Sequence, residues 1–175
     1  MLRRTLGIGL VTLALTLAVP FVLRLIAWSP PAESAGRPYT GLVDRYLAAR
    51  EVPSGLLGHG SRWFCATRFL GAETAGRRVD VDVWALCEET QVTGRRVAIG
   101  TAESVPVVVH LRRTGSGLRA VGYEEPGDSP DYAPDVHRLF PGGMAGWIIG
   151  NGDRGGIGSL DAAVHRQARA AAGRG

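Results

Sequence analysis

The chain has 175 residues, which is enough for one domain of ordinary size plus a short appendage. All 20 basic residues are arginines against 16 acids, and three of these arginines lie in the first 32 residues, which contain no acid. The remainder (17 arginines against 16 acids) lacks the basic excess that nucleic-acid binding requires, and a hydrophobic content of 45% argues against a fully disordered chain.

The amino-terminal part of the chain contains an apolar run. Residues 5–23 carry no charge, and as a helix these 19 residues would reach about 28 Å, close to the thickness of a bilayer core. Arg3 and Arg4 precede the run, so the positive-inside rule keeps this end in the cytoplasm. We therefore expect residues 1–28 to be a signal anchor that crosses the cell membrane once and leaves the rest of the chain outside. The alternative is a signal peptide, with secretion after cleavage near Ser34.

The two cysteines of the chain fit an exported protein. Cys65 and Cys87 are the only pair, and an oxidising compartment would let them form a disulfide. Such a bond closes a loop of roughly 20 residues and would contribute about 3 kcal/mol in the chain-entropy model. The alternative is two buried thiols that never meet. Their spacing does not match the paired cysteines of a zinc site.

The exported part begins with a predicted linker. Residues 29–38 contain three prolines and small polar residues, a composition typical of linkers. From residue 39 to residue 50 apolar side chains recur every three or four positions, which predicts an amphipathic helix. This helix opens an extracytoplasmic domain that we place at residues 39–141. Residues 142–175 follow it as a glycine-rich loop, up to residue 158, and a carboxy-terminal helix.

Between these helices the sequence predicts a sheet. Apolar residues alternate with polar ones in several segments joined by glycine-containing turns, which is the pattern of an antiparallel meander of four or five strands. The strands are expected near residues 62–70, 79–87, 96–101, 105–111 and 118–124. The predicted core face, covered by the helix at 39–50, consists of Val79, Val81, Val83, Val107 and Val109. With a short helix at 132–139, the predicted fold class is α+β.

Part of the domain resembles a known family. The segments VDVWALCEE, PVVVHL and LRAVGYEEPGDSPDYAPDVHRLFP, which span residues 79–141, resemble an uncharacterised domain of exported proteins from Gram-positive bacteria. The matching positions are Pro126, Asp128, Tyr132, Asp135, Phe140 and Pro141. The resemblance implies an exported location and names no activity. A helix followed by a meander is also similar to the cystatin-like and NTF2-like topologies, which is an analogy of fold alone.

Two groups of acids are candidate sites. Asp80 and Asp82 share one strand face and could form a carboxylate pair, but that face lies opposite the valines, so we predict that it faces solvent. Five acids lie between residues 124 and 135, without the spacing of a calcium loop. The prolines and glycine beside them indicate turn chemistry.

Neither a cofactor motif nor a histidine cluster emerges from the sequence. Residues 150–155 match G-x-G-x-x-G, but no second strand follows to complete a dinucleotide-binding unit. The histidines are expected to be solvated, since no two of them share helical i, i+4 spacing: His59, His110, His137 and His165. We therefore predict no catalytic residue, no cofactor and no metal.

The expected function is that of a non-enzymatic domain outside the membrane. Such a domain would bind a protein, a peptide or an envelope component, with the glycine-rich segment 142–158 and exposed aromatic residues as its contact surface. The alternative is a small enzyme with an apolar pocket and one or two carboxylates, which would require a titratable group in a cleft.

Overall fold

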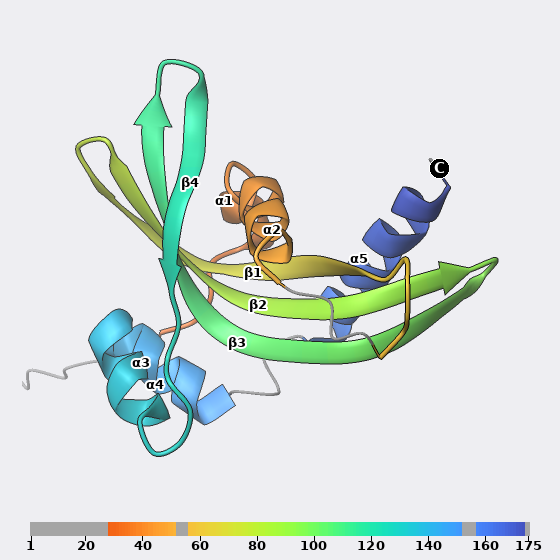
Figure 1. The fold of residues 1–175 in the computed structure, drawn as a ribbon. Coiled ribbons are helices and arrows are strands. Elements are labelled where there is room, and N and C mark those ends of the chain that lie inside the picture. Colours follow the sequence, from red (N-terminus) through yellow and green to blue (C-terminus); the bar gives the residue numbers. More distant parts are fainter. Residues whose placement is uncertain (1–27, 52–55, 152–156, 174–175) are drawn as a thin grey trace, which may run out of the picture.

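Residues 28–51, 56–151 and 157–173 are described by the structure, a computed structural model. None of the helices in these ranges has the length and apolar composition of a membrane span, and the apolar run at 5–23 lies outside the described residues. The described part has an α+β fold (Figure 1). In chain order its elements are α1 (Glu33–Gly36), α2 (Thr40–Ala48), β1 (Arg62–Ala75), β2 (Arg78–Thr93), β3 (Arg96–Thr114), β4 (Gly117–Glu124), α3 (Tyr132–Leu139), α4 (Gly142–Asn151) and α5 (Ile157–Ala172).

The four strands form one antiparallel meander in the order β1-β2-β3-β4. Two-residue loops join all three hairpins, and in the first two the loop opens with a glycine at positive φ, Gly76 and Gly94 at 61° each. A positive φ at this position is what lets a tight turn match the twist of its strands. In Figure 1 the β1–β2 and β3–β4 hairpin ends project on one side of the molecule and the β2–β3 end on the other.

The predicted strands at 96–101 and 105–111 are one continuous strand, β3. Pro106 lies inside it, opposite Trp84 of β2. Strand β4 pairs with β3 only from Val108 to Thr114, so Pro106 is in the part of β3 that forms the sheet edge. A proline is tolerated there because its missing N–H has no ladder partner to lose. The meander therefore has four strands.

Helix α2 covers one face of the sheet. Val43 and Leu47 of α2 pack against the odd-numbered residues of β2 and β3. The five valines of the predicted core face are here, each at most 1% exposed: Val79, Val81, Val83, Val107 and Val109. The crevice between helix and sheet is thus filled with aliphatic side chains.

The stretch suggested as a linker contacts the same face. Residues 29–38 contain α1, whose Gly36 is buried against Phe69 of β1. Tyr39, just before α2, stacks on the Phe69 ring with 5.9 Å between ring centroids. This segment therefore packs on the domain.

The opposite face of the sheet is also covered, which corrects the prediction that it faces solvent. Trp84 and Leu86 of β2 are 3% and 4% exposed, and they pack with residues of α3, α4 and α5. The partners on these helices include Val136, Ile148 and Val164, each fully buried. One helix and one sheet would have left this apolar surface open to water, so the carboxy-terminal third of the chain supplies a third layer.

Helix α4 occupies residues for which the sequence predicted a glycine-rich loop. Gly142–Asn151 is helical, although each glycine lowers helix stability by about 1 kcal/mol relative to alanine. Met144, Ala145 and Ile148 are at most 4% exposed in the second core, and this burial outweighs the poor intrinsic propensity. The loop prediction is wrong for these residues; positions 152–156 lie outside the described residues.

The predicted disulfide is confirmed. Cys65 of β1 and Cys87 of β2 are directly opposite each other in the strand register, and their sulfur atoms are bonded at 2.05 Å. Both residues are buried among the valines under α2. The bond therefore links the two strands in the middle of the first core.

Replacing both cysteines by alanine should lower the free energy of unfolding of the full chain by about 3 kcal/mol, because a closed loop of 22 residues restricts the unfolded chain. Chemical denaturation measures this change. Each single alanine variant should lose about as much as the double variant, since either one removes the bond. A double variant as stable as the wild type would contradict the prediction.

Candidate functional site

A cleft of about 420 Å³ lies at one end of the second sheet face. Its floor is formed by residues of all four strands, and its wall by the end of α3, the start of α4 and Trp28. Leu70, Val108 and Met144 belong to the second core and also line this cleft. The cleft therefore lies where the packed second core gives way to the polar residues of β2.

Strand alternation and register bring charged side chains together on this floor. Asp80 and Asp82 are two apart on β2 and so share a face. In the register His110 of β3 is opposite Asp80, while Gly71 of β1 is opposite Asp82. Glu124 is two residues beyond Gly122, the β4 partner of His110. Strands separated by more than 50 residues in sequence thus contribute to one site.

His110 lies between two carboxylates. Its Nδ1 is 2.7 Å from Asp80 Oδ1 and its Nε2 is 3.1 Å from Glu124 Oε1. A guanidinium group flanks each carboxylate, since Arg78 donates to Asp80 at 2.7 Å and Arg138 of α3 donates to Glu124 at 3.3 Å. Hydrogen bonds therefore link five side chains in a row, which holds the imidazole in a fixed orientation, and Arg78 also lies 3.2 Å from His110 Nδ1.

This network determines the charge of Asp80. Partial burial opposes ionisation of its carboxyl, but hydrogen bonds from Arg78 and His110 outweigh that effect and lower its pKa below the ordinary value of 3.8. Asp80 is therefore a carboxylate at any physiological pH, already engaged by two donors. It is a positioning group for His110 more than a free ligand.

Asp82 is in the opposite situation. Only 9% of it is exposed, and among the described residues no hydrogen-bond donor or cation pairs with its carboxyl. Burial raises its pKa to about 6, and the charges of Asp80 and Glu73 add to this rise. Gly71 leaves the room that this carboxyl occupies, because a Cβ there would lie 3.3 Å from Asp82 Oδ2 and 2.9 Å from Met144 Cε. The cleft thus has at its base a buried carboxyl, that of Asp82, which has no partner among the described residues and a pKa close to neutral pH.

The structure corrects two predictions about these residues. Asp82 was expected on a solvent face and is buried, because α3 and α4 cover that face. His110 was expected to be solvated, yet its side chain is only 17% exposed between two carboxylates. The signal was present in the sequence, since counting back from a two-residue turn at Gly94-Arg95 brings His110 close to Asp80.

The remaining predicted features lie outside the cleft or at its rim. Of the five acids of residues 124–135, Glu124 joins the network, and Asp135 of α3 accepts a hydrogen bond from the Gly127 N–H at 2.9 Å. His59 and His137 are exposed. In the G-x-G-x-x-G segment, Gly150 and Asn151 end α4 and the rest lies outside the described residues.

Asp82→Asn should stabilise the protein at pH 8, by about 1–2 kcal/mol. A carboxyl with a pKa of 3.8 unfolded and about 6 folded favours the folded state below pH 4, and this contribution of about 3 kcal/mol is lost as the pH rises through 6. The amide carries no charge to desolvate but remains polar, so it recovers only part of that loss. Urea unfolding at pH 4 and pH 8 checks the sign.

The gain should vanish at pH 4. Asp44, whose pKa burial also raises to about 6, titrates in the same range, so the variant must be compared with the wild type at each pH. Asp128→Asn, a change of an exposed acid, should alter stability at neither pH. A destabilised Asp82→Asn protein at pH 8 would contradict the assignment of an unpaired carboxyl.

Comparisons with protein-family models, curated proteins and solved structures found no match to this chain. Its function is therefore inferred from the geometry of the cleft.

Proposed function

We propose that the protein is an extracytoplasmic binding domain, held at the cell membrane by residues 5–23, whose cleft accepts an ammonium or guanidinium group of a protein, peptide or envelope component. The observation that carries this proposal is the buried carboxyl of Asp82, which has no partner among the described residues. A cationic ligand group would supply that partner.

The charges of the cleft favour a cation over an anion. Its lining contains four acids against the two guanidinium groups of Arg78 and Arg138. Both guanidinium groups already pair with carboxylates of the network, so the acids left without a described cation are Asp82 at the base and the exposed Glu73. A bound cation would relieve the repulsion between Asp82 and its acidic neighbours, and its own desolvation would be offset by a buried opposite charge.

The place of the cleft in the chain supports a tethered domain. Trp28 lines the cleft and packs edge-on against Trp147 of α4, with ring centroids 5.4 Å apart. Trp28 is five positions beyond the end of the apolar run, which is at most about 18 Å of extended chain. Cleavage near Ser34 would remove this packed tryptophan, so its contacts favour an uncleaved anchor. The cleft would then open close to the membrane surface.

Two further features support the exported location. The Cys65–Cys87 disulfide is typical of an oxidising compartment. The resemblance of residues 79–141 to a domain of exported proteins agrees with it. Neither feature bears on the ligand, for which the cleft alone argues.

The probe that tests this function is N-acetyl-lysine amide, which carries one free ammonium group. Titrated into the full chain in detergent micelles at pH 7.5, it should bind and shift the carboxyl NMR signal of Asp82. Binding should weaken several-fold at pH 5, where Asp82 is mostly protonated, because its pKa is about 6 and the neutral acid no longer attracts the cation.

Control probes and variants test whether binding depends on the charge of the ligand and of Asp82 or only on the shape of the ligand. N-acetyl-norleucine amide, which replaces the ammonium group by a methyl group, should not bind, and Asp82→Asn should weaken binding of the lysine probe at least fivefold. Asp128→Asn removes an exposed acid and should leave binding unchanged. If the norleucine and lysine probes bind alike, or if Asp82→Asn binds as the wild type does, the cleft is not a cation site.

Catalysis is the second candidate, and the pKa of Asp82 is what favours it. A carboxyl with a pKa of about 6 can act as a general acid or base near neutral pH. The cleft is polar, however, whereas the enzyme alternative predicted from the sequence had an apolar pocket. The Asp82→Asn variant distinguishes the two functions. If Asp82 is a catalytic residue, this substitution should abolish turnover and leave ligand binding largely intact.

A further inference from the structure

A second cluster of charged side chains lies at the other end of the same sheet face. Glu88 projects from β2, and Asp161 and His165 lie one turn apart on α5, which crosses the sheet there. One carboxylate oxygen or imidazole nitrogen from each residue lies within 4.8 Å of the other two. The sequence predicts no metal site, and this cluster is not apparent in it because its two helical residues are an aspartate and a histidine and the third comes from a strand.

The buried member of the cluster lacks a hydrogen bond. Glu88 is 4% exposed, and its Oε2 atom has no hydrogen-bond partner. The imidazole of His165 lies beside it, with Nε2 3.3 Å from that oxygen and also without a hydrogen bond. Both atoms are buried and in contact, but their geometry does not make a hydrogen bond. A buried donor or acceptor without a hydrogen bond is costly, so a ligand that bound both atoms would stabilise this arrangement.

The distances from the imidazole nitrogen to the two carboxylate oxygens suit a metal ion, and all three atoms lie within 4.8 Å of one another. Four ligands at zinc-bond lengths of 2.0–2.1 Å are about 3.3 Å apart in a tetrahedron. His165 Nε2 is 3.3 Å from Glu88 Oε2 and 3.7 Å from Asp161 Oδ1. One nitrogen and two carboxylate oxygens are ligands that zinc and similar divalent ions accept. We propose that Glu88, Asp161 and His165 bind a divalent transition-metal ion, with zinc as the preferred ion.

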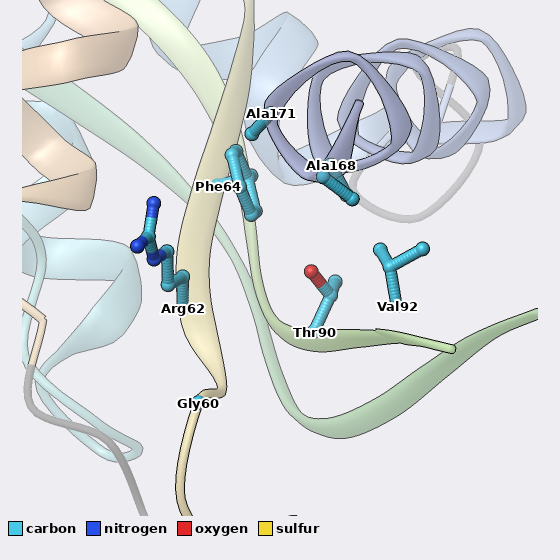
Figure 2. Close-up of a pocket in the computed structure, with 8 residues that line it drawn as sticks. Gly60, Arg62, Phe64, Thr90, Val92, Ala168 and Ala171 are labelled. Carbon is cyan, nitrogen blue, oxygen red and sulfur yellow. The ribbon is translucent and has the colours of Figure 1, made fainter. Parts of the chain in front are cut away.

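The site can be reached from solvent. The side chain of Asp161 is 44% exposed and that of His165 is 22% exposed, so an ion can enter from the helix side. Further along the same two elements is a hollow of about 460 Å³ between the sheet and α5. Figure 2 shows Thr90 and Val92 of β2 and Ala168 of α5 pointing into it. Thr90 Oγ1, two residues from Glu88, is buried there without a hydrogen bond.

Zinc and cobalt(II) are the probes for this site. The full chain, purified in detergent without a histidine tag and treated with a chelator, should bind one equivalent of Zn²⁺ by calorimetry. With Co²⁺ it should develop visible absorption bands of a low-coordinate ion. Cys65 and Cys87 are joined in the disulfide and do not compete for the metal. Zinc should also raise the melting temperature of the wild type.

Three variants assign the ligands. Glu88→Gln, Asp161→Asn and His165→Gln should each raise the zinc dissociation constant at least tenfold and weaken the cobalt bands, with unchanged circular dichroism. Asp161 is half-exposed, so Asp161→Asn keeps the test valid if a change at a more buried position disturbs folding. The matched controls on the exposed surface around α3, Asp131→Asn and His137→Gln, should bind as the wild type does.

Several results would overturn the proposal. These are a wild-type chain that binds neither zinc nor cobalt stoichiometrically, one that binds calcium but not these ions, and an Asp161→Asn variant with wild-type affinity. The cation cleft is tested at pH 7.5 with an organic ligand and different variants, so failure there would leave the metal site standing.

Discussion

Strand β2 is enclosed on both faces, and this burial decides where its charged residues can lie. Its odd-numbered residues from Val79 to Cys87 meet α2, and its even-numbered residues from Trp84 onward meet the carboxy-terminal helices. Because a strand alternates its side chains between faces, an acid within the covered stretch is buried whichever way it points. Glu89 illustrates this, since it is fully buried and its carboxylate accepts a hydrogen bond from Ser61 at 2.6 Å.

The stability that the two apolar cores provide offsets the destabilising effect of such buried acids. An unpaired carboxyl such as Asp82 costs about 3 kcal/mol when its pKa rises from 3.8 to about 6. Each fully buried valine contributes about 1.5 kcal/mol or more, and the first core alone contains six at no more than 1% exposure. The fold therefore tolerates an unfavourable charge. Such a residue persists without a structural benefit of its own, which is typical of groups kept for binding or chemistry.

The alternation of apolar and polar residues with a period of two predicted most of what the sequence could show of the fold. It located the strands and the valine face, since these depend on local pattern alone. The disulfide was predictable on another ground, because Cys65 and Cys87 are the only two cysteines of the chain. The alternation could not show that the second face is covered, because the helices that cover it come from residues 132–172. The glycine content of residues 142–151 indicates a loop, whereas these residues form α4, whose stability depends on tertiary burial of Met144 and Ile148. The cleft was missed for the same reason, since its wall belongs to those helices.

The metal cluster escaped prediction for another reason. Asp161 and His165 have the spacing of helix neighbours, but the third group, Glu88, comes from a strand 73 residues earlier, as the residue numbers show. Only the packing of α5 on the sheet brings them together. A histidine and an aspartate at i, i+4 are common on exposed helices as a weak ion pair, so the pair alone indicates no metal.

The cleft and the metal cluster are independent sites, although both stand on the same face of β2. Asp82 and Glu88 are six residues apart, which is roughly 20 Å along a strand. Trp84 and Leu86 fill the space between them, each almost fully buried. That distance is more than twice the Debye length at physiological ionic strength, about 8 Å, although buried charges are screened less than exposed ones. The apolar residues offer no titratable group to relay a proton. Occupancy of one site should therefore change the affinity of the other very little, and substitutions at the two sites should be additive.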